Sequence, residues 1–163
     1  MKRSLMAVAA ALGLVVGLAI PALSATSYSS RVTYWQANVG GANWCGKVQA
    51  QISDGTDYPP NGAAGSWSFA YYGANCLNTH NVPAGYLGAQ VHLVKSGGTL
   101  CGSTPWSWNG GSNWYHSSFK ALSPSGSCPA HASYRSEAHA QHWNPNTNQY
   151  VNSSWVNSPY IPF

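Results

Sequence analysis

The stretch that defines the fold is residues Tyr86–Cys101, which read YLGAQVHLVKSGGTLC. Every second residue from 87 to 93 is apolar, and the residues between them are Gly, Gln and His. This alternation is typical of a β-strand with one buried face. The Gly97-Gly98 pair then reverses the chain, so the stretch predicts a β-hairpin whose return arm carries Cys101.

The rest of the chain has the composition of an all-β protein. Only 6% of its 163 residues are charged, against about a quarter in an average globular domain, and it holds 8 Trp and 10 Tyr. Aromatic residues favour strands, and segments rich in Gly, Asn, Ser and Pro separate the extended stretches. We therefore predict a small, disulfide-stapled antiparallel β-sandwich or barrel. Its expected strands are Arg31–Gln36, Lys47–Ile52, Ser66–Tyr72, Leu87–Lys95, Thr99–Cys101 continuing through Trp108, Trp114–Lys120, Arg135–Trp143 and Gln149–Trp155.

Residues 130–143 allow two interpretations. By residue propensity, the Ala-rich sequence AHASYRSEAHAQHW could form the one helix of the molecule. As a strand, it places Ser136, Ala138 and Ala140 on one face and the larger polar residues on the other. We favour the strand, because the same pattern occurs in Leu87–Lys95.

The N-terminus has the features of a secretory signal peptide. Lys2 and Arg3 precede an apolar run from Leu5 to Ile20, and small residues follow up to Ala25. We predict cleavage after Ala25, leaving residues 26–163 as a single secreted domain without a membrane anchor. Five cations and three carboxylates then remain. The cations form no cluster, which argues against nucleic-acid binding.

Four cysteines, at positions 45, 76, 101 and 128, are an even number, as expected of a disulfide-bonded exported protein. Spacing alone leaves three connectivities open. A faint internal repeat relates the segments after Cys76 and Cys128, since each contains a Tyr ten residues before a turn. From this repeat we predict the pairs Cys45–Cys76 and Cys101–Cys128.

The residues that could support catalysis or bind a metal ion are sparse. His139 and His142 would share a face only on a helix, and on the preferred strand they point in opposite directions. Asp54 and Asp57 lie in one loop, and Glu137 has no evident carboxylate partner for glycosidase chemistry. We therefore predict no catalytic residue, no metal site and no cofactor.

Aromatic side chains next to polar ones give the better functional indication. Trp rings beside amide and imidazole groups are what a sugar-stacking site requires, although core packing is the commoner role of any one Trp. Eight Trp are difficult to bury in one small domain. The candidate binding residues are Trp106, Trp108, Trp114, Tyr115, Arg135, Glu137, His139, Gln141 and Trp143.

Three classes of function follow from these residues. The first is a non-catalytic extracellular module that binds a glycan or a cell-wall polymer. The second is a secreted antagonist, either an antibacterial toxin or a protease inhibitor that presents the Pro-containing loop Asp54–Gly62. The third is a small hydrolase that relies on Glu137 and His139.

Overall fold

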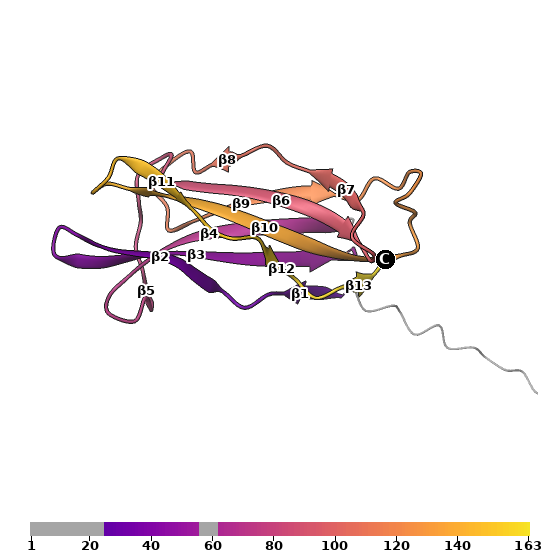
Figure 1. The fold of residues 1–163 in the computed structure, drawn as a ribbon, viewed down its shortest axis with the longest axis horizontal. Helices are drawn as coiled ribbons and strands as arrows, with labels where there is room; N and C mark the ends of the chain where they lie inside the picture. The colour runs from indigo at the N-terminus through magenta and orange to yellow at the C-terminus, as the bar shows by residue number, and fades with distance from the viewer. Residues whose placement is uncertain (1–24, 56–61) are drawn as a thin grey trace, which may run out of the picture.

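Two antiparallel β-sheets pack face to face in the computed structural model, which describes residues 25–55 and 62–163 (Figure 1). Sheet I has six strands and sheet II has seven. Sheet I consists of β1 (Thr26–Tyr28), β2 (Val32–Val39), β3 (Ala42–Ser53), β4 (Ala63–Tyr72), β5 (Asn78–Thr79) and β9 (Tyr115–Ala121). Sheet II consists of β6 (Leu87–Lys95), β7 (Leu100–Ser103), β8 (Ser107–Trp108), β10 (Ser133–Asn144), β11 (Gln149–Asn152), β12 (Val156–Asn157) and β13 (Ile161–Pro162). The predicted all-β fold is confirmed, as a sandwich.

The longest strands form the centre of each sheet, and shorter strands line their edges. In sheet I, β3 pairs with β4, while β1 and β2 share the outer edge of β3, and β5 and β9 share that of β4. In sheet II, β6 pairs with β10 over nine residues. Strands β7 and β8 flank β6, and β11, β12 and β13 follow one another along β10.

The predicted hairpin is present as β6 and β7. The Lys95 N–H donates to the Thr99 carbonyl and the Gly98 N–H to the Lys95 carbonyl, so the loop has three residues, Ser96, Gly97 and Gly98. Gly97 and Gly98 have positive φ angles, 92° and 89°, which glycine adopts readily. Residues 130–143 form no helix; most of them belong to β10, which confirms the strand interpretation. Its residues alternate strictly between buried and partly exposed.

Two strand predictions were wrong in extent. The expected continuation from Thr99 through Trp108 is interrupted, because Thr104 turns its backbone N–H and its hydroxyl toward Val91 and the chain re-enters the sheet only at Ser107. The expected strand Gln149–Trp155 ends at Asn152, as β11, since Ser153 leaves the ladder and its hydroxyl accepts a hydrogen bond from the Ala140 N–H. The next strand, β12, begins only at Val156, beyond the predicted range. Short edge strands carry few apolar residues, so no hydrophobic alternation in the sequence predicts where they begin and end.

Small side chains fill the centre of the sandwich. Serine hydroxyls donate directly to backbone carbonyls of the opposite sheet: Ser136 to Gly65 at 2.7 Å, and Ser66 to His139 at 3.2 Å. Such short side chains bridge two sheets only where the sheets approach closely. The buried central positions are accordingly Ala50, Ala64, Ser66, Ser68, Ala70, Ser136, Ala138 and Ala140.

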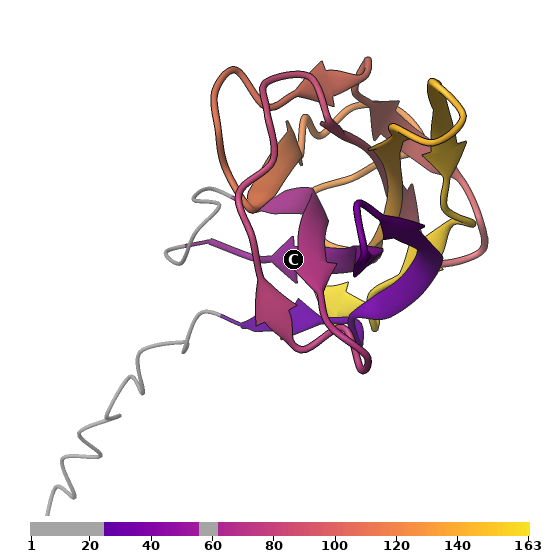
Figure 2. The same cartoon turned by 90° about the vertical axis from the view of Figure 1, so that its left-hand side faces the viewer.

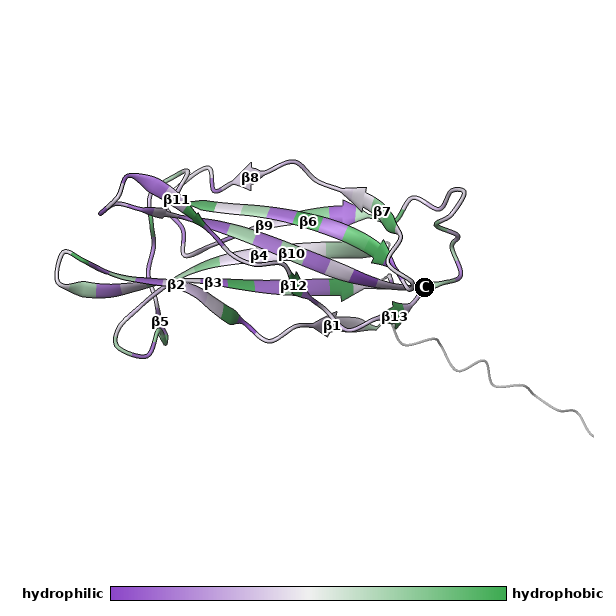
Figure 3. Cartoon of the chain, in the orientation of Figure 1, coloured by the Kyte–Doolittle hydropathy of each residue, from purple (hydrophilic) through white to green (hydrophobic). Residues whose placement is uncertain are grey.

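Larger apolar residues gather at the end of the sandwich near the C-terminus. Ile52, Val91, Leu93, Tyr134 and Ile161 form this cluster, and the hydrophobic ends of β3, β6 and β13 are visible there in Figure 3. At the opposite end, where the β2–β3 and β10–β11 hairpins extend (Figure 1), the interior contains aromatic rings and histidines. The view along the strands shows both sheets curving around this interior (Figure 2).

Both predicted disulfides are confirmed. Cys45–Cys76 joins β3 to the turn after β4, and Cys101–Cys128 joins β7 to the segment before β10. Paired cysteines suggest an oxidising environment. In the described ranges, no helix is long and apolar enough to cross a membrane. The predicted signal peptide lies outside the described residues, apart from Ala25, as does most of the Asp54–Gly62 loop.

Candidate functional site

Strand β10 presents five of the predicted site residues on the outer face of sheet II. Buried residues of this strand alternate with partly exposed ones, because the inward residues pack against β3 and β4. The outward set includes Arg135, Glu137, His139, Gln141 and Trp143. Trp106 and Trp108, from the β7–β8 segment, join this face through His139 and through each other. Seven of the nine predicted residues therefore share one surface.

Rings on this face form a continuous series of contacts, which we call the aromatic row. Neighbouring ring centroids along it lie between 4.0 and 6.3 Å apart, within or close to the range of favourable aromatic pairs. Trp155 (39% exposed) and Tyr150 (41%) are its most open members. The row comprises, in order of contact, His92, Trp155, His139, Trp106, Trp108, Tyr150, Trp143 and Tyr86.

Gly88 allows the middle of the aromatic row to lie against strand β6. A Cβ atom at this position would come within 2.6 Å of Cζ3 of Trp108. Gly88 and Trp108 are direct partners in the ladder between β6 and β8. The missing side chain therefore leaves the space that the indole ring occupies.

Hydrogen-bonding groups border the rings. Arg135 Nη2 donates to Glu137 Oε1 at 2.6 Å, and Glu137 Oε2 lies 3.7 Å from His92 Nδ1. The Gln141 amide donates to Asn152, and the Gln90 amide donates to the Thr104 carbonyl at 3.0 Å. Amide and carboxylate groups beside aromatic rings can bind the hydroxyl groups of a sugar whose ring stacks on the aromatics.

The two histidines with possible metal-binding spacing lie on opposite sides of sheet II. His139 belongs to the aromatic row, whereas His142 is buried between the sheets against Trp35, with ring centroids 4.6 Å apart. Burial lowers the pKa of His142 to about 4, so its imidazole is neutral at pH 7. Burial also lowers the pKa of His139. Within the described residues, no three His, Cys, Asp or Glu side chains are grouped as metal ligands.

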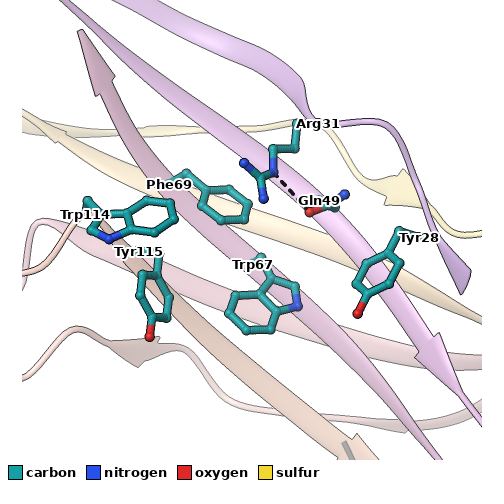
Figure 4. Close-up of a pocket in the computed structure, with 7 residues that line it drawn as sticks. All are labelled: Tyr28, Arg31, Gln49, Trp67, Phe69, Trp114 and Tyr115. Carbon is teal, nitrogen blue, oxygen red and sulfur yellow. Dashed lines mark hydrogen bonds between the residues drawn. The ribbon is translucent and has the colours of Figure 1, made fainter. Parts of the chain in front are cut away.

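Trp114 and Tyr115, the other two predicted residues, lie on the outer face of sheet I. They line a hollow of about 520 Å³ (Figure 4). Its other lining residues come from β1, β3, β4 and the segment before β2, and they are Tyr28, Arg31, Gln49, Trp67 and Phe69. The predicted set thus divides between two surfaces.

Sequence reasoning missed four members of the aromatic row. For His92 a signal existed, since it lies on the polar face of the same alternating stretch that predicted β6. Tyr86, Tyr150 and Trp155 gave none, because they lie at strand ends or on edge segments. Only the pairing of the strands with β10 defines the neighbours of these three residues. The hollow on sheet I was missed for a similar reason, since its residues come from four separate segments.

Comparison of the chain with family models, with curated proteins and with solved structures found no match. The chemistry of its two aromatic surfaces is therefore the basis on which its function can be inferred.

Proposed function

We propose that this protein is a secreted, non-catalytic module that binds a neutral glycan chain of a cell wall or other extracellular polymer along the aromatic row. The single observation that carries this proposal is the unbroken series of eight rings, joined by seven contacts, on the outer face of sheet II. Pyranose rings place their C–H groups on the faces of aromatic rings. Several successive rings suit a polymer better than a single sugar.

The charges on this face favour an uncharged ligand. Arg135 and Glu137 form an ion pair at 2.6 Å, so each neutralises the other. Glutamine and asparagine amides supply most of the remaining polar groups. The two disulfides and the N-terminal apolar segment support an extracellular location.

The other two function classes have less support. A hydrolase based on Glu137 and His139 would need a second group to share the chemistry, and the described carboxylate Asp54 is instead bound to the backbone N–H of Ala25 at 2.6 Å. Glu137 is paired with Arg135. The loop that an inhibitor would present falls largely on residues 56–61, outside the described ranges.

Retention on insoluble polysaccharide tests the proposal. The oxidised protein is mixed with cellulose, chitin and purified cell walls, and the unbound fraction is measured. We expect Trp155→Ala to weaken retention by roughly tenfold, or ~1.4 kcal/mol, because it removes an open stacking surface. Gly88→Ala should act in the same direction by displacing Trp108.

A matched control removes an exposed apolar side chain elsewhere. Leu77 is 73% exposed in the turn between β4 and β5, and Leu77→Ala should leave retention unchanged. Thermal unfolding of each variant shows whether the fold is intact. Equal retention of the parent protein, W155A and G88A would exclude the aromatic row as the binding site.

A further inference from the structure

The hollow on the outer face of sheet I is a second aromatic surface with a different character. Trp67, Phe69 and Trp114 form its floor: the Trp67 and Phe69 rings are 6.2 Å apart and nearly parallel, at 10°, and Phe69 and Trp114 are 5.9 Å apart at 26°. Figure 4 shows these rings side by side, with Tyr115 at the rim. A volume of about 520 Å³ is within the usual range for small-molecule sites.

Arg31 extends over this floor and is held in place by three contacts. Its guanidinium carbon lies 4.3 Å from the centre of the Phe69 ring. Its Nε donates to Gln49 Oε1 at 3.2 Å, as drawn in Figure 4, and its Nη1 donates to the Tyr71 hydroxyl. Among the described residues, none accepts a hydrogen bond from its Nη2. The guanidinium is thus oriented and retains donor capacity for a ligand.

A second cation lies beside Arg31. The ammonium group of Lys47 is 4.2 Å from the centre of the Tyr71 ring, the same tyrosine that Arg31 contacts. Burial, and then repulsion from Arg31, lower the pKa of Lys47. Neither of the described carboxylates, Asp54 and Glu137, lines the hollow. Arg31 is the cation among the described lining residues, Lys47 lies outside the lining, and no carboxylate lines the hollow. This balance of charge favours an anionic ligand.

We propose that this hollow binds a carboxylate-bearing sugar unit of an acidic glycan. The apolar face of the sugar ring would lie on the Trp67 and Trp114 rings, and its carboxylate would accept hydrogen bonds from Arg31 Nη2. Lys47, which does not line the hollow, would add positive charge near it. Tyr28 and Gln49, also in the lining, can bind its hydroxyl groups. This site goes beyond the neutral-glycan function and lies on the opposite outer face of the sandwich, so the protein can join two polymers.

Titration with tetragalacturonate and with its fully methyl-esterified form tests this site. The two probes share their sugar rings and differ in charge. Tryptophan fluorescence and calorimetry of the oxidised protein should show binding of the acid at least tenfold tighter than binding of the ester. Added salt should reduce this difference, because the contacts of the carboxylate are partly open to solvent. Equal affinity for both probes would overturn the proposal.

Charge variants locate the site. Arg31→Gln should weaken tetragalacturonate binding at least tenfold, whereas Lys95→Gln removes the same charge from β6 in sheet II and should have no effect. Arg31→Lys, which keeps the charge but not the planar donors, should give an intermediate affinity. Equal losses in R31Q and K95Q would show nonspecific attraction to cations and would also overturn the proposal. If R31Q does not fold, Trp114→Ala tests the same surface.

The two binding sites can fail independently. Trp155→Ala should leave tetragalacturonate binding intact, and Arg31→Gln should leave retention on neutral polysaccharide intact. Failure to retain neutral polysaccharide, with tetragalacturonate binding intact, would count against the aromatic row alone. Failure to bind tetragalacturonate, with that retention intact, would count against the hollow alone.

Discussion

The two outer faces of the sandwich use the same kind of residue in different ways. Sheet II spreads eight rings in a row and neutralises its arginine with Glu137. Sheet I gathers its rings around one hollow, with Arg31 above Phe69, Lys47 outside the lining over Tyr71, and no carboxylate in the lining. The comparison shows that aromatic residues provide the stacking surface, while the neighbouring charges determine which class of ligand suits it.

This arrangement depends on the small interior. A conventional sandwich buries its large residues between the sheets, but here Ala and Ser occupy the central positions. In β4, the inward Ser66 and Ser68 alternate with the outward Trp67 and Phe69. Of the eight Trp, all of them within the described part of the chain, only Trp35 is among the buried residues. Close packing of small side chains thus leaves the aromatics for the two surfaces.

Removal of the Cys45–Cys76 disulfide should produce the largest difference between the binding activities of the two faces. This bond packs with Phe69 and Tyr71 on sheet I and closes a loop of 31 residues, for which loop entropy predicts a stabilisation of ~3.5 kcal/mol. The double variant Cys45→Ala/Cys76→Ala should lose about that much unfolding free energy in urea. Its tetragalacturonate binding should weaken more than its retention on neutral polysaccharide.

The Cys101–Cys128 disulfide provides the matched control. It closes a loop of similar length, 27 residues, but packs in the cluster at the C-terminal end of the sandwich. Its removal should cost a similar free energy and affect both binding activities equally. If the two double variants had the same binding profile, the Cys45–Cys76 bond would not organise the hollow.

Low pH should reduce the unfolding free energy of the protein, because His142 is buried between the two sheets. The pKa of buried His142 is about 4, below its ordinary value of 6.5, so between these values the unfolded chain binds the proton more readily. The contribution of neutral His142 to stability should therefore be complete above about pH 7 and be lost as the pH decreases from 6.5 to 4, by on the order of 3 kcal/mol. Burial shifts the pKa values of His80 and His116 in the same direction.

Urea unfolding at several pH values measures this effect. His142→Gln should remove most of the slope between pH 6.5 and 4, whatever its cost at neutral pH. His131 is exposed, and His131→Gln should leave the slope unchanged. An unchanged slope in H142Q would show that other groups cause the acid sensitivity.

Removal of the Glu137 charge on sheet II should have the smallest effect on stability and binding among these predictions. It tests directly whether charge decides which class of sugar each face binds. Glu137→Gln leaves Arg135 without its partner and gives this face an uncompensated cation, as on sheet I. The ion pair is partly exposed, so the loss of stability should be about 1 kcal/mol or less. In an Arg31→Gln background, which removes the first site, the change should raise tetragalacturonate affinity several-fold. No gain would mean that ring arrangement, rather than charge, excludes acidic sugars from sheet II.

Local patterns in the sequence predicted the central elements of the fold. Alternation and the Gly97-Gly98 pair predicted the β6–β7 hairpin, and alternation in β10 correctly favoured a strand over a helix. The repeat around Cys76 and Cys128 predicted both disulfides. The hairpin and the strand depend on residues close in the chain, whose backbone geometry limits what they can form. The disulfides join residues 31 and 27 positions apart, and only the repeated pattern indicated their pairing.

Only the tertiary structure decided which residues form each surface. A period of two shows that Arg135, Glu137 and His139 share a face of their strand, but it does not reveal which strands lie beside them or whether that face points inward. Trp155 reaches the aromatic row because β12 pairs with β10, and Trp114 leaves the predicted set because its segment leads into β9 of the other sheet. Hydrophobicity alone would have placed the Trp rings in the core. The closely packed Ala and Ser residues between the sheets leave no room for them there.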